Sequence, residues 1–433
     1  MLHNPGVPGL LFLELNELNF EYVEHYARRG LLPGFARLLA AHGYARTRSE
    51  DVYDHVEPWI QWITVHTGKA YREHRVFRLG DGARAGLRQI WEELAARGLK
   101  VGAFSPMNAP AVPEAAFFVP DPWTRTSVIA PAWMRRAYEA ISQAVGDNAQ
   151  GRIRPASALR LLVGLLLYGR LKNWPAYASE ALTGLRNHWP RAIFLDRFLG
   201  DCFLNLWRRT RPDFATLFLN GAAHIQHHCM FNSPAYPGPN RNPAWYLPQD
   251  VDPVLEIYRL YDRLLAECLE LPGRPRVMIA TGLHQDPVDE PVFYWRLRDH
   301  TAFLQRIGCE FVSVEARMSR DFLVNCADAA QSARAGALLR SGKAPDGTPL
   351  FEVDDRGRSL FVTLSYPHDI ERGLRAEFSG GRTEELSEEV VFVAIKNGHH
   401  NGIGYFLDTG ARSSPQSEPI PLGELWQRMV AAF

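Results

Sequence analysis

The sequence predicts an α/β protein with a mostly parallel central sheet. Three short apolar runs, at 10–15, 213–219 and 276–281, have the length and composition of strands that are buried on both faces. Residues 90–104 combine a helical pattern, a glycine at Gly98 and a further apolar run, which is the order expected of a βαβ unit. Such folds bind ligands beyond the carboxyl ends of their strands, so the residues after each run are candidates for a site.

Composition limits the class of protein. The chain has 433 residues, 46% of them hydrophobic and 22% charged, as in soluble globular proteins with one large domain or two ordinary ones. Its 48 basic and 48 acidic residues balance, so the net charge provides no overall attraction for nucleic acid or an anionic membrane. Local patches of basic residues are still compatible with this balance. The five cysteines lack CxxC spacing, which favours reduced thiols and a cytoplasmic location.

No segment has the pattern of a membrane anchor. The first residues lack the basic start and cleavage site of a secretory signal, and the apolar run at 9–15 is too short to span a bilayer. The run at 161–168 is also short and has Arg160, Arg170 and Lys172 at its ends. We expect a buried or interfacial helix there, and no stable membrane insertion.

We divide the chain into three parts. Residues 1–124 and 211–433 have the α/β pattern of a core, with a small subdomain at about 299–386. Residues 125–210 are rich in Arg, Leu and Trp and have few strand signals, so we expect a helical insertion or cap. Such a cap would choose substrates and exclude water, or its basic residues would form an ordinary solvated face.

Residues 56–68 contain a predicted helix with a glutamate directly before it. Pro58 suits the first helical turn, because its missing N–H would be unpaired there, and Gly68 suits the end. Glu57 therefore lies beside exposed backbone N–H groups, where helices favour anions. It is either a site residue or an acid that stabilises the helix dipole.

Polar residues follow the first two strands. Asn16 and Glu17 follow the first; Asn16 is a candidate site residue or, with Asn19, a helix cap. The second is followed by three histidines in five residues, and imidazole is costly to bury without a partner. We therefore expect a role for at least one of them. His224 and His228 share a face if helical, so either could be a second ligand or a donor to an ester oxygen; the third is His227.

Two further segments hold candidates near strand ends. His284 and Gln285 follow the third strand, and His284 would either point into the site or make a loop hydrogen bond. His399 and His400 lie in a glycine-rich segment after the apolar run at 390–395. The alternative there is a turn with solvated histidines.

The chain resembles the type I phosphodiesterase and nucleotide pyrophosphatase branch of the alkaline phosphatase superfamily. Trp62, Thr67, Gly68 and His74 match its nucleophile helix in order and spacing, and the resemblance covers about residues 8–123 and 211–408. It implies a three-layer sandwich around a mostly parallel sheet. Glu57 stands in the place of the family's Thr or Ser nucleophile.

The resemblance also implies a set of site residues. Its metal-binding positions correspond to Asn16, in place of an Asp, to His227 and His400, and to His284 beside a lost Asp-His pair. Fewer anionic ligands remain than two cations require, so we expect one divalent ion (Zn, Mn or Fe) rather than two, with a metal-free site as the alternative. We predict catalytic roles for Glu57, His224 and His228, and substrate binding by Glu17, Gln285 and His399.

Two functions follow from these candidates. The first is hydrolysis or transfer of a phosphoric or sulfuric ester of a small molecule, with Glu57 as general base or ligand. The second is a metal-free relative that binds an anionic or sugar-like ligand or performs His/Glu acid–base chemistry. An oligomer is compatible with either.

Overall fold

The structure is a computed structural model that describes residues 9–124, 126–146, 154–317 and 320–433. The described residues form two compact units, a core unit (within Met1–Val145, Ile153–Pro287 and Gly398–Phe433) and a second unit (within Val288–Asn397). Residues 1–8, on which the expectation about a secretory signal rests, and Arg125, the predicted start of the helical insertion, lie outside the described residues.

The core unit is built on an eight-stranded sheet in the order β16-β2-β15-β6-β1-β5-β3-β4. Only β15 runs antiparallel to its neighbours, so the sheet is mostly parallel and the predicted α/β class is confirmed. The strands are β1 (Leu10–Leu15), β2 (Ala45–Arg48), β3 (Val101–Phe104), β4 (Phe117–Val119), β5 (Phe214–Leu219), β6 (Arg276–Ala280), β15 (Ile403–Asp408) and β16 (Ile420–Pro421).

The register of the central strands places their carboxyl ends together. Leu15 at the end of β1 is level with Leu219 at the end of β5, and Glu14 is level with Ala280 at the end of β6. All residues of β1 and β5 are buried, as expected of strands covered on both faces. The residues that follow these strands therefore meet at one edge of the sheet.

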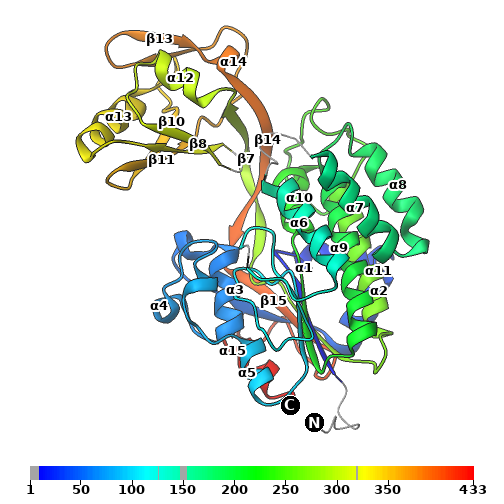
Figure 1. The fold of residues 1–433 in the computed structure, drawn as a ribbon. Helices are drawn as coiled ribbons and strands as arrows, with labels where there is room; N and C mark the ends of the chain where they lie inside the picture. Colours follow the sequence, from blue (N-terminus) through cyan, green and yellow to red (C-terminus); the bar gives the residue numbers. More distant parts are fainter. Residues whose placement is uncertain (1–8, 125, 147–153, 318–319) are drawn as a thin grey trace. The chain divides into compact units, whose positions relative to one another are not determined.

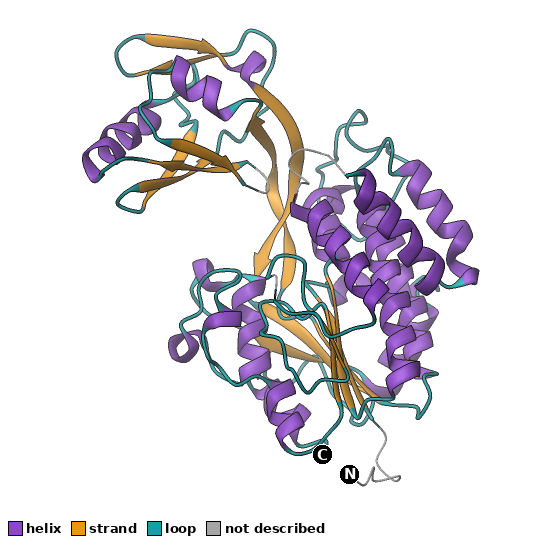
Figure 2. Ribbon diagram, viewed as in Figure 1, coloured by secondary structure: helices purple, strands orange, loops and turns teal. Residues whose placement is uncertain are grey.

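Helices cover both faces of this sheet, which gives three layers (Figure 2). One layer packs over a core that contains Phe12, Trp62 and Trp91; it consists of α3 (Pro58–Thr67), α4 (Tyr71–His74), α5 (Ile90–Ala96) and α15 (Glu424–Val430). The other layer consists of α1 (Phe20–Arg28), α2 (Pro33–His42), α9 (Trp189–Thr210), α10 (Gly221–Cys229) and α11 (Pro253–Leu269) (Figure 1). Short 3-10 turns occur at Tyr53–His55, Gly82–Arg84 and Met230–Asn232.

The described part of the predicted insertion is helical. It contains α6 (Ala132–Gly146), α7 (Pro155–Tyr168), the 3-10 turn η4 (Leu171–Asn173), α8 (Trp174–Thr183) and α9. Both α7 and α8 pack against α9, which in turn packs against α10 and α11. Within the described residues, none of the helices combines the length and the apolar character that crossing a bilayer requires.

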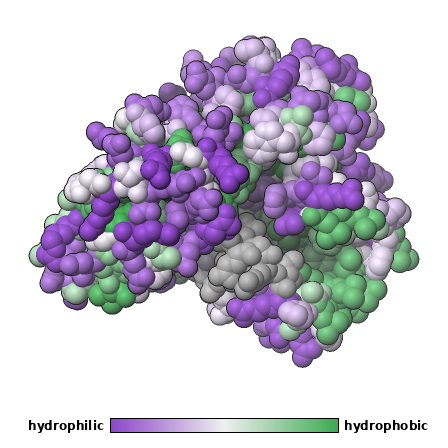
Figure 3. Space-filling view, turned by 90° about the horizontal axis from the view of Figure 1, so that it is seen from above, coloured by the Kyte–Doolittle hydropathy of each residue, from purple (hydrophilic) through white to green (hydrophobic). Residues whose placement is uncertain are grey.

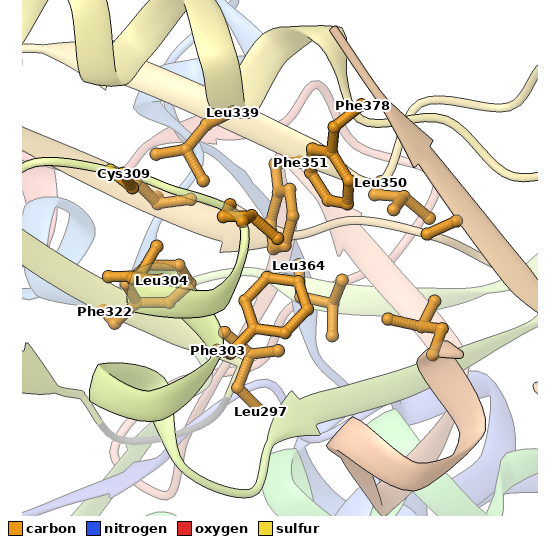
Figure 4. Packing of buried hydrophobic residues seen from close by; sticks show 14 of the residues in the cluster. Leu297, Phe303, Leu304, Cys309, Phe322, Leu339, Leu350, Phe351, Leu364 and Phe378 are labelled. Carbon is orange, nitrogen blue, oxygen red and sulfur yellow. The ribbon is translucent and has the colours of Figure 1, made fainter. Parts of the chain in front are cut away.

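The second unit has its own hydrophobic core. The paired strands β7 (His284–Leu297) and β14 (Val390–Asn401) run into it from the core unit. Phe303, Phe322, Phe351 and Phe378 pack together in its interior (Figure 4). Its other elements are α12 (His300–Arg306), β8 (Ser313–Ala316), β9 (Asp321–Asn325), α13 (Ala329–Ser341), β10 (Phe351–Asp355), β11 (Ser359–Leu364), β12 (Arg375–Phe378), β13 (Arg382–Glu385) and α14 (Leu386–Glu389).

Candidate metal centre

Glu17 lies at the carboxyl end of β1 in a strained backbone conformation. Its φ is 59°, a region that a residue other than glycine occupies at a cost of about 1–3 kcal/mol. Its backbone N–H donates to the carbonyl of Thr281 over 3.0 Å, and its carbonyl accepts a 2.7 Å hydrogen bond from the side chain of Gln226. These contacts hold the strained residue in place and direct its side chain into the protein, where it is 2% exposed.

The carboxylate of Glu17 is held by two amides. Oε1 accepts a hydrogen bond from Asn16 Nδ2 at 2.9 Å, and Oε2 accepts one from Gln285 Nε2. Burial works to raise the pKa of this carboxyl, but the nearby His400 and His227 lower it well below the usual value. Glu17 is therefore an oriented carboxylate inside the protein.

His227 reaches Glu17 from α10. Its Nδ1 lies 3.1 Å from the carbonyl oxygen of Gly398, an arrangement in which the ring donates its Nδ1–H and leaves Nε2 toward the site. Nε2 lies 3.3 Å from Glu17 Oε2. The start of α10 is fixed by Asp196, whose Oδ2 accepts a 2.7 Å hydrogen bond from the N–H of Gly221.

His400 completes the group from the end of β14. Its Nε2 lies 3.4 Å from Glu17 Oε2 and its Nδ1 lies 3.5 Å from Glu57 Oε2. Burial of the ring works to lower its pKa, but Glu17, Glu57 and the backbone at Val56 raise it to about 9. The nitrogen Nε2 is buried, and it faces the carboxylate of Glu17.

Glu57 occupies the residue before α3, as predicted, but its side chain does not cap the helix. It makes no side-chain hydrogen bond to the backbone of the first turn. About a third of the side chain is exposed, and its carboxylate faces His400. Glu57 therefore lies between solvent and the buried histidine.

The spacing of Glu17, His227 and His400 fits a metal ion. Within the described part of the chain they are the one group of at least three His, Cys, Asp or Glu side chains whose ligand atoms lie within 4.8 Å of one another. A tetrahedral zinc site with bonds of about 2.0–2.2 Å places its ligand atoms roughly 3.4 Å apart. The separations of 3.3 and 3.4 Å from Glu17 Oε2 to the two imidazole nitrogens agree with that value. The carbonyl of Gly398 behind His227 also matches the way metal-binding histidines are oriented.

Two predicted metal ligands have other partners in this structure. The amide of Asn16 donates to Glu17 and, over 2.8 Å, to Asn220, while its carbonyl oxygen accepts a 2.7 Å hydrogen bond from Trp62. Asn16 therefore lies beside the three-residue group and orients Glu17. Both ring nitrogens of His284 are engaged, Nδ1 with the carbonyl of Ile403 at 2.5 Å and Nε2 with Asp286 at 3.1 Å. His284 therefore lies outside the group.

The remaining predicted site residues lie around it. His224 is exposed on α10, with its ring centroid 5.3 Å from that of His228, and the rings of His228 and His227 are 6.1 Å apart. Gln285 contacts Glu17 directly. His399 precedes His400 on β14, and successive side chains of a strand point to opposite faces.

The role of Glu17 in the site, and the residues that orient it, are not evident from the sequence. The sequence predicts substrate binding for Glu17, whereas its Oε2 lies 3.3 Å from His227 Nε2 and 3.4 Å from His400 Nε2. Gln226 and Trp62, which hold Glu17 and Asn16, were given no role. A glutamate directly after a buried strand is the one available signal for Glu17.

Comparison with known proteins gives a distant likeness of fold. No family model matches the chain, and no curated protein matches it in sequence. Among solved structures, phosphonoacetate hydrolase from Sinorhizobium meliloti, in complex with phosphonoacetate, matches with a TM-score of 0.47 at 14% identity, over 98% of this chain and 95% of that one. An inactive murine ectonucleotide pyrophosphatase / phosphodiesterase 5 with AMP matches with a TM-score of 0.42 at 10% identity, over 98% and 94%.

Proposed function

We propose that the core unit is a hydrolase or transferase for a phosphoric or sulfuric ester, with one divalent cation held by Glu17, His227 and His400. The observation that carries the proposal is the pair of short separations from Glu17 Oε2, 3.3 Å to His227 Nε2 and 3.4 Å to His400 Nε2. Two histidines and one glutamate are an established ligand set for catalytic zinc, which leaves a position open for a substrate. A bound divalent cation would polarise the ester and stabilise the charge that develops on the transferred group.

The charge of the site favours a monoanionic ester. Glu17 and Glu57 contribute two carboxylates, which one divalent cation would balance with both histidines neutral. In this balanced site a phosphate monoester would leave two uncompensated negative charges, whereas a phosphodiester or a sulfate ester would leave one. We propose these monoanionic esters as the substrate class.

Glu57 is proposed as the general base. Its carboxylate is partly exposed and faces His400 over 3.5 Å, so it can accept the proton of an attacking water or alcohol while His400 holds it in place. His228, on the same helix as His227, is proposed to donate the proton to the leaving oxygen, and His224 beside it is proposed to hydrogen-bond that oxygen through its neutral ring. Gln285 is proposed to help orient the substrate through its contact with Glu17. His399 is proposed to do so from its position beside His400.

A metal-free site is the second candidate. Its support is the pKa of about 9 at His400, which makes the ring a cation between two carboxylates when no metal competes. That arrangement has excess negative charge, so it favours a neutral, sugar-like ligand over an anionic one. Acid–base chemistry between Glu57 and His400 would then replace metal-assisted transfer.

The test is an activity screen of metal-loaded protein with bis(p-nitrophenyl) phosphate, p-nitrophenyl sulfate and p-nitrophenyl phosphate. We expect turnover of the first or second above the third, and a loss of about 10²–10⁴-fold in kcat for Glu57→Gln with unchanged metal content. Glu114→Gln, at an exposed loop glutamate of the core unit, is the matched control. Full activity of Glu57→Gln would remove Glu57 from the mechanism, and activity that persists without metal would favour the second candidate.

A further inference from the structure

The helices α7 and α8 expose an apolar surface that the proposed chemistry does not use. Leu159, Leu162 and Leu166 follow one another at i, i+3 and i+7, so they share one face of α7. We define the leucine patch by six side chains that are between 51% and 85% exposed: Leu159, Leu162, Leu166, Leu171, Leu182 and Leu185. Soluble proteins rarely expose contiguous apolar surfaces of this kind without a partner.

The elements that carry the leucine patch are linked through one helix. Both α7 and α8 pack against α9, and η4 joins them in the chain. Figure 3 shows a broad hydrophobic area on its right-hand side, the side on which Figure 1 has α7 and α8.

The chain segment that carries the leucine patch is rich in basic residues. Residues 154–191 contain one acidic residue, Glu180, and six basic ones: Arg154, Arg160, Arg170, Lys172, Arg186 and Arg191. The neighbouring Glu139 pairs with Arg160, and Glu267 pairs with Arg170 and Lys172, so a basic excess remains after these partners are counted. Because the whole chain has no net charge, this excess is local.

The local excess of basic residues favours one possible partner of the leucine patch over another. A second copy of the chain would bring two basic surfaces together, which costs energy by repulsion. A lipid surface with anionic headgroups accepts both the leucines and the basic residues of the same chain segment. With 14 residues, α7 is shorter than the roughly 20 needed to span a bilayer, so it would lie in the plane of the headgroups.

We propose that α7, η4 and α8 dock the protein on an anionic lipid bilayer through the leucine patch. The leucines enter the boundary between headgroups and acyl chains, and Arg and Lys side chains contact the headgroup phosphates. This attachment is independent of the proposed ester chemistry.

The test is sedimentation of the full chain with vesicles of phosphatidylglycerol and phosphatidylcholine, compared with vesicles of phosphatidylcholine alone. We expect the protein to bind the anionic vesicles at least tenfold more tightly than the neutral ones. Added salt should weaken binding to the anionic vesicles. Leu159→Gln/Leu162→Gln/Leu166→Gln should weaken it at least tenfold, and so should Arg160→Glu/Arg186→Glu. Val312→Gln, at an exposed apolar residue of the second unit, should leave it unchanged.

Three results would overturn this proposal. The first is a lack of binding to anionic vesicles. The second is binding that the leucine variant retains in full while its thermal unfolding matches that of the wild type. The third is a dimer in gel filtration that the leucine variant dissociates, because a second copy would then cover the patch.

Discussion

The side-chain amide of Asn16 donates a 2.9 Å hydrogen bond to the carboxylate of Glu17, its neighbour in the chain. Asn16 is itself held by Trp62 of α3 and by Asn220 before α10, so three elements determine the direction of one carboxylate. Removal of hydrogen-bond partners that orient a metal ligand typically weakens metal binding.

Asn16→Ala should therefore weaken binding of a divalent cation by about 10–100-fold without removing a ligand. Gln285→Ala should act in the same direction, because Gln285 donates to the other oxygen of Glu17. Calorimetric titration of metal-free protein with Zn²⁺ measures both. The control is Asn325→Ala, which removes an amide–carboxylate hydrogen bond to Glu315 in the second unit and should leave zinc affinity unchanged.

A second carboxylate–imidazole pair lies inside the core unit. Glu14 of β1 and His66 of α3 are fully buried, with Oε1 and Nε2 3.1 Å apart. Glu14 Oε2 and His66 Nδ1 make no hydrogen bond to any described residue. The pair therefore connects α3, which follows Glu57, to the strand that precedes Glu17.

His66→Leu should lower the free energy of unfolding by about 3 kcal/mol or more, because it leaves a buried carboxyl group without its partner. Adding Glu14→Gln to this variant should restore part of the loss, since an amide is less costly to bury than a carboxylate. Urea denaturation of metal-free protein measures each variant. Equal, small effects of His66→Leu and the double variant would show that the pair does not stabilise the fold.

Asp196 should make the stability of the core unit depend on pH. Burial raises its pKa to about 6, against the hydrogen bonds from Tyr261 and Gly221 that work to lower it. The folded protein therefore binds this proton more tightly than the unfolded chain does, and the free energy of unfolding should fall as pH rises from about 4 to about 6, by roughly 2–3 kcal/mol at most.

Asp196→Asn should remove that fall. An amide oxygen can accept both hydrogen bonds that Oδ2 accepts, at 2.6 Å from Tyr261 and 2.7 Å from Gly221. Urea midpoints at several pH values between 4 and 7, for wild type and variant, measure the difference. If both proteins lost the same stability over this range, the titrating group would be a different one.

The sequence predicts the central strands well because their apolar runs are short, dense and bounded by polar residues. The predicted 10–15, 213–219 and 276–281 correspond to Leu10–Leu15, Phe214–Leu219 and Arg276–Ala280. The position of β15 between β2 and β6 was not predictable, because it depends on pairing between segments far apart in the chain.

The site could be predicted only in part, for a similar reason. Strand ends bring His227 and His400 to one edge of the sheet, but the direction of Glu17 depends on its positive φ and on the amides of Asn16 and Gln285. Likewise, the carbonyl of Ile403 and the carboxylate of Asp286, which occupy both nitrogens of His284, are contacts that no spacing in the sequence indicates.

The central claim is that Glu17, His227 and His400 bind one divalent cation. The most direct measurement is the metal content, by elemental mass spectrometry, of protein purified without chelator or affinity-tag metal. We predict about one equivalent of Zn, Mn or Fe per wild-type chain and in His42→Ala, a control at a half-buried histidine outside the group, but less than about a tenth of that in Glu17→Gln and His400→Ala. A wild-type protein that contains no metal and regains none on titration, or a Glu17→Gln variant that keeps the full equivalent, would contradict the claim.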